Sequence, residues 1–120
     1  MTSLGEKGEN LVANYLSEKG WQILAQRWNC RWSDLDVVAS DRSNLIFVEV
    51  KTRSAGNWDE DGLLSITPKK QGKLWQAARA FLGEHQPQFD HFNCRFDVAL
   101  VSHRTNSLCL KTYLENAFTI

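Results

Sequence analysis

The stretch from Asn44 to Arg53, N-L-I-F-V-E-V-K-T-R, limits the possible folds more than any other part of the chain. Five of its residues are large and apolar, mostly branched or aromatic, which is typical of a buried β-strand. Glu49 and Lys51 interrupt this run, and because they are two residues apart they share one face of the strand. Charges on such a strand are costly to bury without partners. We therefore expect this strand to carry the chemistry of the protein.

A second apolar run, L-D-V-V-A at 35–39, carries Asp36 thirteen residues before Glu49. The residues between the two runs, S-D-R-S-N at 40–44, are typical turn formers. The two runs therefore predict an antiparallel hairpin. Asp36 and Glu49 lie at similar distances from the turn, so we expect both carboxylates to come within reach of one ion.

The remaining segments predict the order helix, three strands, helix, two strands, which is an α/β class with a mixed five-stranded sheet flanked by helices. Ser3 begins the first helix in a capping box with Glu6, and Thr67-Pro68 begins the second. Ser54 to Ile66 reads as a long polar loop, and 114–120 as a short helix or tail. At 120 residues, the chain is expected to form a single domain over 1–120.

Two glycines stand inside the first turns of the first predicted helix. Each of Gly5 and Gly8 costs that helix about 1 kcal/mol relative to alanine. One interpretation is close approach to a neighbouring element or ligand, and the other is a frayed first turn.

The formal net charge of zero gives a nucleic-acid partner no general basic surface, so any phosphate contact must come from local clusters. Lys69, Lys70 and Lys73 crowd the start of the second helix, where the helix dipole already attracts anions. A phosphate contact and a merely solvated helix face explain these lysines equally well.

Other features point to an ordinary cytoplasmic protein. The three cysteines are odd in number and widely spaced, which favours reduced thiols over a disulfide or zinc site. The first twenty residues lack the apolar core of a signal peptide, and no run is long enough to cross a membrane.

Asp36 and Glu49 offer the hard oxygen ligands that Mg²⁺ or Mn²⁺ prefers, and the carbonyl of Val50 offers a further one. Lys51 beside such an ion can orient a water or stabilise developing negative charge. The alternative is purely structural, with Glu49 and Lys51 forming a salt bridge on the strand face.

The chain resembles the PD-(D/E)xK nuclease superfamily, and more closely the YraN-like family of small bacterial proteins. The resemblance covers nearly the full length and depends on these motifs: G-E-K-G-E at 5–9 with Ala13, Tyr15 and Leu16, N-C-R at 29–31, D-L-D-V-V-A at 34–39, F-V-E-V-K-T-R at 47–53, the lysines of the second helix, and R-F-D-V at 95–98. Two positions depart from the family pattern: Ser33-Asp34 replaces Gly-Glu, and Ala55-Gly56-Asn57-Trp58 stands where Phe-Gly is expected.

This resemblance implies a restriction-endonuclease-like core, similar to Holliday-junction resolvases. It implies that Asp36, Glu49 and Lys51 form the metal and catalytic centre, with Glu9 facing the same site. Arg31 and Arg53, within the quoted motifs, join the helix lysines as nucleic-acid-binding candidates. The implied activity is Mg-dependent cleavage of DNA, in branched or damaged form, by a homodimer. The alternative is a non-catalytic nucleic-acid- or partner-binding module that retains the nuclease fold.

Overall fold

The computed structural model describes residues 2–54 and 66–118, so residues 55–65 of the polar loop expected between Ser54 and Ile66 lie outside the described residues.

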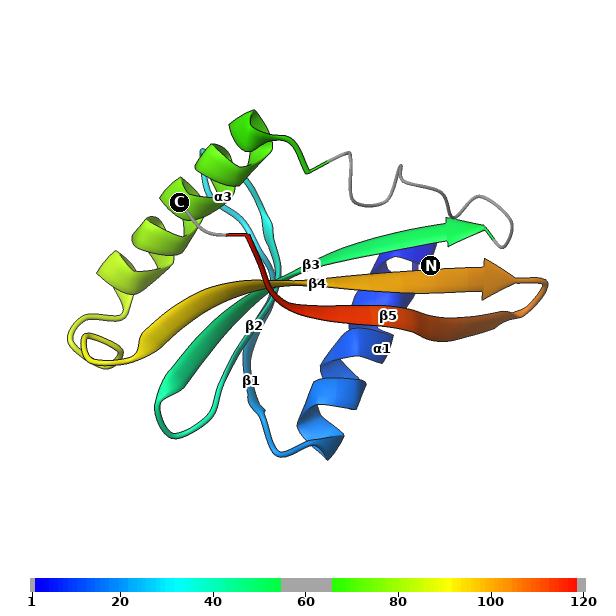
Figure 1. Ribbon diagram of the computed structural model, residues 1–120, viewed down its shortest axis with the longest axis horizontal. Helices are drawn as coiled ribbons and strands as arrows, with labels where there is room; N and C mark the ends of the chain where they lie inside the picture. The colour runs from blue at the N-terminus through cyan, green and yellow to red at the C-terminus, as the bar shows by residue number, and fades with distance from the viewer. Residues whose placement is uncertain (1, 55–65, 119–120) are drawn as a thin grey trace.

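 The described chain contains two helices, α1 (Leu4–Glu18) and α3 (Pro68–Glu84). Its five strands are β1 (Gln22–Trp28), β2 (Leu35–Ser40), β3 (Asn44–Ser54), β4 (Asn93–Arg104) and β5 (Ser107–Phe118) (Figure 1). The predicted order of helix, three strands, helix and two strands is confirmed.

The strands form one sheet in the order β1-β2-β3-β4-β5. β3 and β4 pair in parallel, and the other three neighbouring pairs are antiparallel. A parallel pair needs a long crossover connection, and α3 lies in the connection between β3 and β4. The mixed five-stranded sheet flanked by helices is therefore confirmed.

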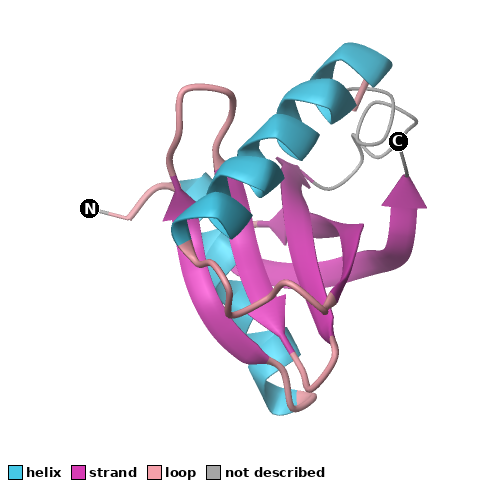
Figure 2. Cartoon of the chain, turned by 90° about the vertical axis from the view of Figure 1, so that its left-hand side faces the viewer, coloured by secondary structure: helices cyan, strands magenta, loops and turns pink. Residues whose placement is uncertain are grey.

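The two helices cover opposite faces of the sheet, one in front of it and one behind (Figure 2). Leu74, Ala77 and Phe81 of α3 pack on one face, where Phe47 and Phe96 are the largest fully buried side chains of the sheet. On the other face α1 packs against a second core cluster made of Val12, Ala13, Leu16, Val37, Ala39, Ile46, Val48, Ala99 and Val101. Alternate residues of β3 thus enter different cores, which explains its nearly continuous apolar sequence.

Local signals set the ends of both helices. The Ser3 Oγ accepts a 3.1 Å hydrogen bond from the Glu6 backbone N–H at the start of α1. At α3, the Thr67 Oγ1 accepts one of 3.2 Å from the Lys70 N–H, and Pro68 occupies the first turn. Gly20 takes a φ of 99° just after α1, a conformation that favours glycine.

The prediction of a helix or tail from residue 114 is wrong for 114–118, because β5 continues to Phe118. The Phe118 ring stacks on Phe96 with centroids 4.9 Å apart, so this end of β5 is held by the core on the α3 face. The pairing of β4 with β5 shifts register twice, and Asn116 has a φ of 50°. These irregularities break the period-2 pattern by which a strand is recognised in a sequence.

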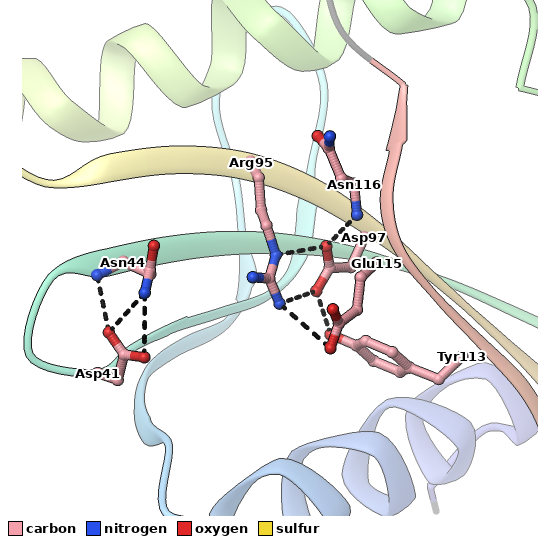
Figure 3. Close-up of polar contacts among 7 residues, drawn as sticks. All are labelled: Asp41, Asn44, Arg95, Asp97, Tyr113, Glu115 and Asn116. Carbon is pink, nitrogen blue, oxygen red and sulfur yellow. Dashed lines mark hydrogen bonds and ion pairs between the residues drawn. The ribbon is translucent and has the colours of Figure 1, made fainter.

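A buried carboxylate fixes this irregular part of β5 (Figure 3). Asp97 of β4 is fully buried, and it accepts hydrogen bonds from Arg95 Nε at 3.0 Å and from the Tyr113 hydroxyl at 2.6 Å. The backbone N–H of Asn116 donates to the same carboxylate at 2.9 Å. Arg95 and Asp97 share one face of β4, opposite Phe96 and Val98.

Among the described residues, neither helix is long and apolar enough to cross a membrane.

Candidate functional site

The hairpin of β2 and β3 brings Asp36 and Glu49 together. Val37 pairs with Val48 in this antiparallel ladder, which places Asp36 and Glu49 at the next opposed position. The Asp36 Oδ2 accepts a 2.8 Å hydrogen bond from the backbone N–H of Val50, so Asp36 is fixed against β3. The turn is held by Asp41, whose Oδ1 accepts from the N–H groups of Ser43 and Asn44. The register expected from the sequence is confirmed.

Two lysines flank Glu49 from different elements. Lys51 Nζ lies 3.6 Å from the Glu49 Oε2, and Lys70 Nζ of α3 lies 3.9 Å from the same oxygen. Lys70 also donates a 3.2 Å hydrogen bond to the Ser33 hydroxyl. The start of α3 therefore supplies a cation to the carboxylate pair of the hairpin.

Burial controls the electrostatics of this group. Glu49 is 5% exposed, and the residues lining the space around the carboxylate pair include Leu35, Phe47, Leu74 and Phe96. Burial raises the pKa of Glu49 to about 8, assisted by the charge of Asp36 and a hydrogen bond with it, while Lys51 and Lys70 act in the opposite direction. The site is therefore short of positive charge when both carboxylates are ionised.

Glu9 belongs to α1 and is held by a residue that the sequence did not single out. Its Oε1 lies 3.5 Å from Arg27 Nε, and Arg27 also pairs with Glu6 at 2.6 Å. Burial and, second to it, the charge of Asp36 raise the pKa of Glu9 to about 7, against the opposing effect of Arg27. Glu9 thus shares the electrostatic field of Asp36, and its Oε1 is buried without a hydrogen-bond partner in the described part of the chain.

Gly8 explains how α1 comes so close to the sheet. A Cβ added at Gly8 would lie 2.1 Å from the Thr52 Oγ1 of β3, whereas one at Gly5 would meet nothing nearer than 3.9 Å. The close-approach interpretation therefore holds for Gly8 and not for Gly5. The helix turn that carries Glu9 is seated directly on the strand that carries Glu49.

The other predicted site residues do not join this group. The Arg31 guanidinium lies 4.7 Å from the centre of the Trp32 ring, and Arg53 donates to the Thr52 carbonyl at 3.0 Å. Lys69 and Lys73 are exposed on α3 and make no ion pair with another described residue. The structure thus brings together Asp36, Glu49, Lys51 and Lys70, with Glu9 nearby.

Sequence reasoning missed Arg27 and Ser33. Arg27, next to the last residue of β1, has a φ of 54°, a conformation that the residue type did not suggest. In the sequence, Ser33 stands out only as a departure from a family motif. Neither contact has a local signal, because each joins segments that are distant in the sequence.

The donor set at the centre fits a hard divalent cation. Asp36 and Glu49 present carboxylate oxygens side by side, and an added cation would relieve the repulsion that raises the Glu49 pKa. Within residues 2–54 and 66–118, no cluster of three or more His, Cys, Asp or Glu side chains suited to a metal is found. Any further ligands would be backbone oxygens such as that of Val50, water or substrate.

Fold and site together define a class: a small mixed α/β protein with a buried carboxylate pair and two lysines on its central strands. More specifically, residues 8–101 match the model of the uncharacterised protein family UPF0102, and the chain belongs to this family. A UPF0102 protein of Synechococcus sp. (strain JA-3-3Ab) is 52% identical over 124 residues, covering 100% of this chain and 94% of that protein. One of Thermosynechococcus vestitus is 51% identical over 121 residues, covering 100% and 97%.

Proposed function

We propose that this protein is a Mg²⁺- or Mn²⁺-dependent phosphodiester hydrolase of the DNA endonuclease type, with a restriction-endonuclease-like core of the PD-(D/E)xK superfamily. The observation that carries the proposal is the placement of Glu49. Its carboxylate is buried opposite Asp36, with Lys51 and Lys70 within 4 Å of one of its oxygens. A salt bridge on a strand face needs neither the second carboxylate nor the second lysine.

Each member of the group has a role in this proposal. Asp36, Glu49 and the Val50 carbonyl would hold the cation, which would supply Lewis-acid activation of the scissile phosphate and of a water molecule. Lys51 orients that water or stabilises the negative charge that develops during attack. Glu9 supplies a further carboxylate from α1.

The basic side chains outside the central group would position DNA. Lys69 and Lys73 are exposed near the start of α3, and Lys70 in the same turn reaches Glu49. A DNA backbone lying across this helix end would pass beside the carboxylate pair. Arg31 and Arg53 complete the proposed contacts. We place the activity in the cytoplasm, on branched or damaged DNA.

Cleavage assays test the proposal directly. Labelled junction, flap and linear DNA would be incubated with the protein and Mg²⁺ or Mn²⁺. We expect strand cleavage that is lost in Asp36→Ala and Lys51→Ala and retained in Glu84→Gln, which changes an exposed carboxylate at the end of α3. Absence of cleavage on every substrate, or equal cleavage by the Asp36→Ala variant, would overturn the proposal.

A second candidate is a non-catalytic module that binds nucleic acid or a protein partner. The zero net charge favours its protein-binding form, because a protein that must hold DNA, whether or not it is an enzyme, generally benefits from a basic surface. Calorimetric titration with Mg²⁺ and Mn²⁺ separates the two candidates. DNA binding with no metal binding, in the presence or absence of DNA, would support the non-catalytic module.

A further inference from the structure

A groove runs along the side of α1 that is turned towards the first residues of β5. One hollow of about 630 Å³ is lined by residues of both elements, among them Leu11, Tyr15, Leu108 and Leu110. A second, of about 500 Å³, adjoins it and shares Lys7, Leu11 and Leu108. The groove therefore has apolar side chains of α1 and β5 along it and reaches the β4–β5 turn at Asn106, and neither Asp36 nor Glu49 lines it.

The two charges on the groove stand at the wrong ends of α1 for helix stability. Lys7 lies in the first turns, near the positive end of the helix dipole, and Glu18 is the last helical residue, near the negative end. Neither makes an ion pair with another residue of the described chain. Their placement thus weakens α1 by itself, and both remain available to an outside partner.

The helix residues along the groove form a stripe that matches itself when reversed. Lys7, Leu11, Asn14 and Glu18 recur at intervals of four, three and four, which keeps them on one side of a helix. An antiparallel copy of the same helix places Glu18 opposite Lys7 and Asn14 opposite Leu11. Two identical ion pairs then form, one at each end of the contact. The dipoles of the two helices point in opposite directions, which is the favourable alignment.

We propose that this groove is the contact surface for a second copy of this chain, with α1 packed antiparallel against α1 about a two-fold axis. Leu11 and Leu108 of each copy supply the apolar part of the contact, Asn14 of the other copy lies against Leu11, and Lys7 and Glu18 of the two copies pair at the rim. The reversed charge order selects a second copy over an unrelated peptide, because an identical surface supplies both complementary charges at once. This contact does not depend on nuclease activity.

Charge reversal tests the contact by sedimentation equilibrium. The Lys7→Glu and Glu18→Lys variants each place like charges together at both ends of the helix pair, so each should weaken dimerisation at least about tenfold. The double variant Lys7→Glu/Glu18→Lys restores opposite charges and should recover the dimer. Glu84→Lys is the matched control, since it reverses an exposed charge at the end of α3 and should leave the dimer unchanged.

Three results would overturn the proposal. A wild-type protein that is monomeric at its highest soluble concentration would leave the groove to some other partner. A dimer unaffected by either single reversal would place the interface elsewhere. Single variants that weaken the dimer, with no recovery in the double variant, would contradict the pairing of Lys7 with Glu18. Circular dichroism of each variant checks that α1 is still formed.

Discussion

Glu49 is the residue at which stability and the proposed chemistry oppose each other. It is 5% exposed beside a second carboxylate, so its ionised form is unfavourable in the folded protein without added positive charge. Lys51 and Lys70 offset only part of the cost of ionising Glu49, since the pKa of Glu49 remains raised. A bound cation would supply the remainder.

The variant Glu49→Gln should change how stability depends on pH. The carboxyl has a pKa of 4.5 when unfolded and about 8 when folded, so between these values the unfolded chain releases a proton that the folded chain keeps. The free energy of unfolding of the wild type should therefore fall as pH rises from 4.5 to 8, by at most about 1.4 kcal/mol per pH unit from this group. In Glu49→Gln this carboxyl is absent, so the free energy of unfolding should not fall in this way. Between pH 4.5 and 8 the variant should therefore become more stable than the wild type.

Urea unfolding of both proteins at several pH values, in the presence of a chelator, measures the difference. Parallel pH profiles would contradict the raised pKa. The same variant separates the site from a simple salt bridge, because a structural Glu49–Lys51 pair predicts altered stability with unchanged metal and DNA binding.

Gly8 allows a second prediction at the residue scale. Gly8→Ala gains helix propensity but forces a methyl group against the Thr52 Oγ1, and we expect a net loss of about 1–2 kcal/mol. Gly5→Ala meets no such obstacle and should stabilise α1 by up to about 1 kcal/mol. Thermal unfolding of both variants and of Gly8→Ala/Thr52→Ala measures this. The double variant should recover part of the stability that Gly8→Ala loses. Equal effects of Gly8→Ala and Gly5→Ala on stability would rule out the close contact between position 8 and Thr52.

At the scale of elements, β5 shows how a buried polar group can define a strand. Its final residues lack clean alternation, and their position depends on the bonds from Tyr113 and Asn116 to Asp97. Asp97 also holds Arg95, whose guanidinium lies 5.5 Å from the centre of the Trp21 ring. The Asp97 carboxylate thus joins β4 to the end of β5, and Arg95 extends this contact to Trp21, which lies between α1 and β1.

Removal of one bond to Asp97 should be costly. Tyr113→Phe leaves the buried carboxylate with one partner fewer, and we expect a loss of about 1.5–3 kcal/mol in the free energy of unfolding. Tyr15→Phe is the matched control, because the Tyr15 ring lies 5.7 Å from that of Tyr113 and its hydroxyl makes no hydrogen bond to a described residue. Chemical denaturation of both variants gives the comparison. Equal losses would mean that the hydroxyl of Tyr113 contributes nothing specific.

The elements differ in how far the sequence could predict them. The capped helices and the β2–β3 hairpin were predictable, because Ser3, Thr67-Pro68 and the Asp41 turn act through residues within four positions of one another. The end of β5 was not, because Asp97 is 19 positions from Asn116 and acts through a contact across the sheet.

At the scale of the whole molecule, the zero net charge limits how DNA can be held. If the proposed function is correct, binding depends on a few local cations rather than a general basic field. Each phosphate contact contributes about −0.9 to the slope of log affinity against log salt, and the four proposed contacts, from Lys69, Lys73, Arg31 and Arg53, predict a shallow slope of about −3.6. Lys69→Ala and Lys73→Ala should each reduce its magnitude by about 1.

Fluorescence anisotropy with labelled DNA at several salt concentrations measures these slopes. Lys19→Ala is a suitable control, because Lys19 follows α1 on the opposite face of the sheet and lies 5.1 Å from the centre of the Tyr15 ring. A slope that is unchanged in both α3 variants would show that DNA does not contact this helix end.

The amino-acid sequence was enough to predict the class of fold, the order of its elements, and the opposition of Asp36 and Glu49. These follow from the alternation of apolar residues, from helix caps and from one short turn, all of which act over a few residues. Tertiary structure alone decided that Lys70 reaches Glu49, that Arg27 holds Glu9, and that Gly8 rests on Thr52. Each of these contacts joins segments that only packing brings together, so no local pattern in the chain encodes it.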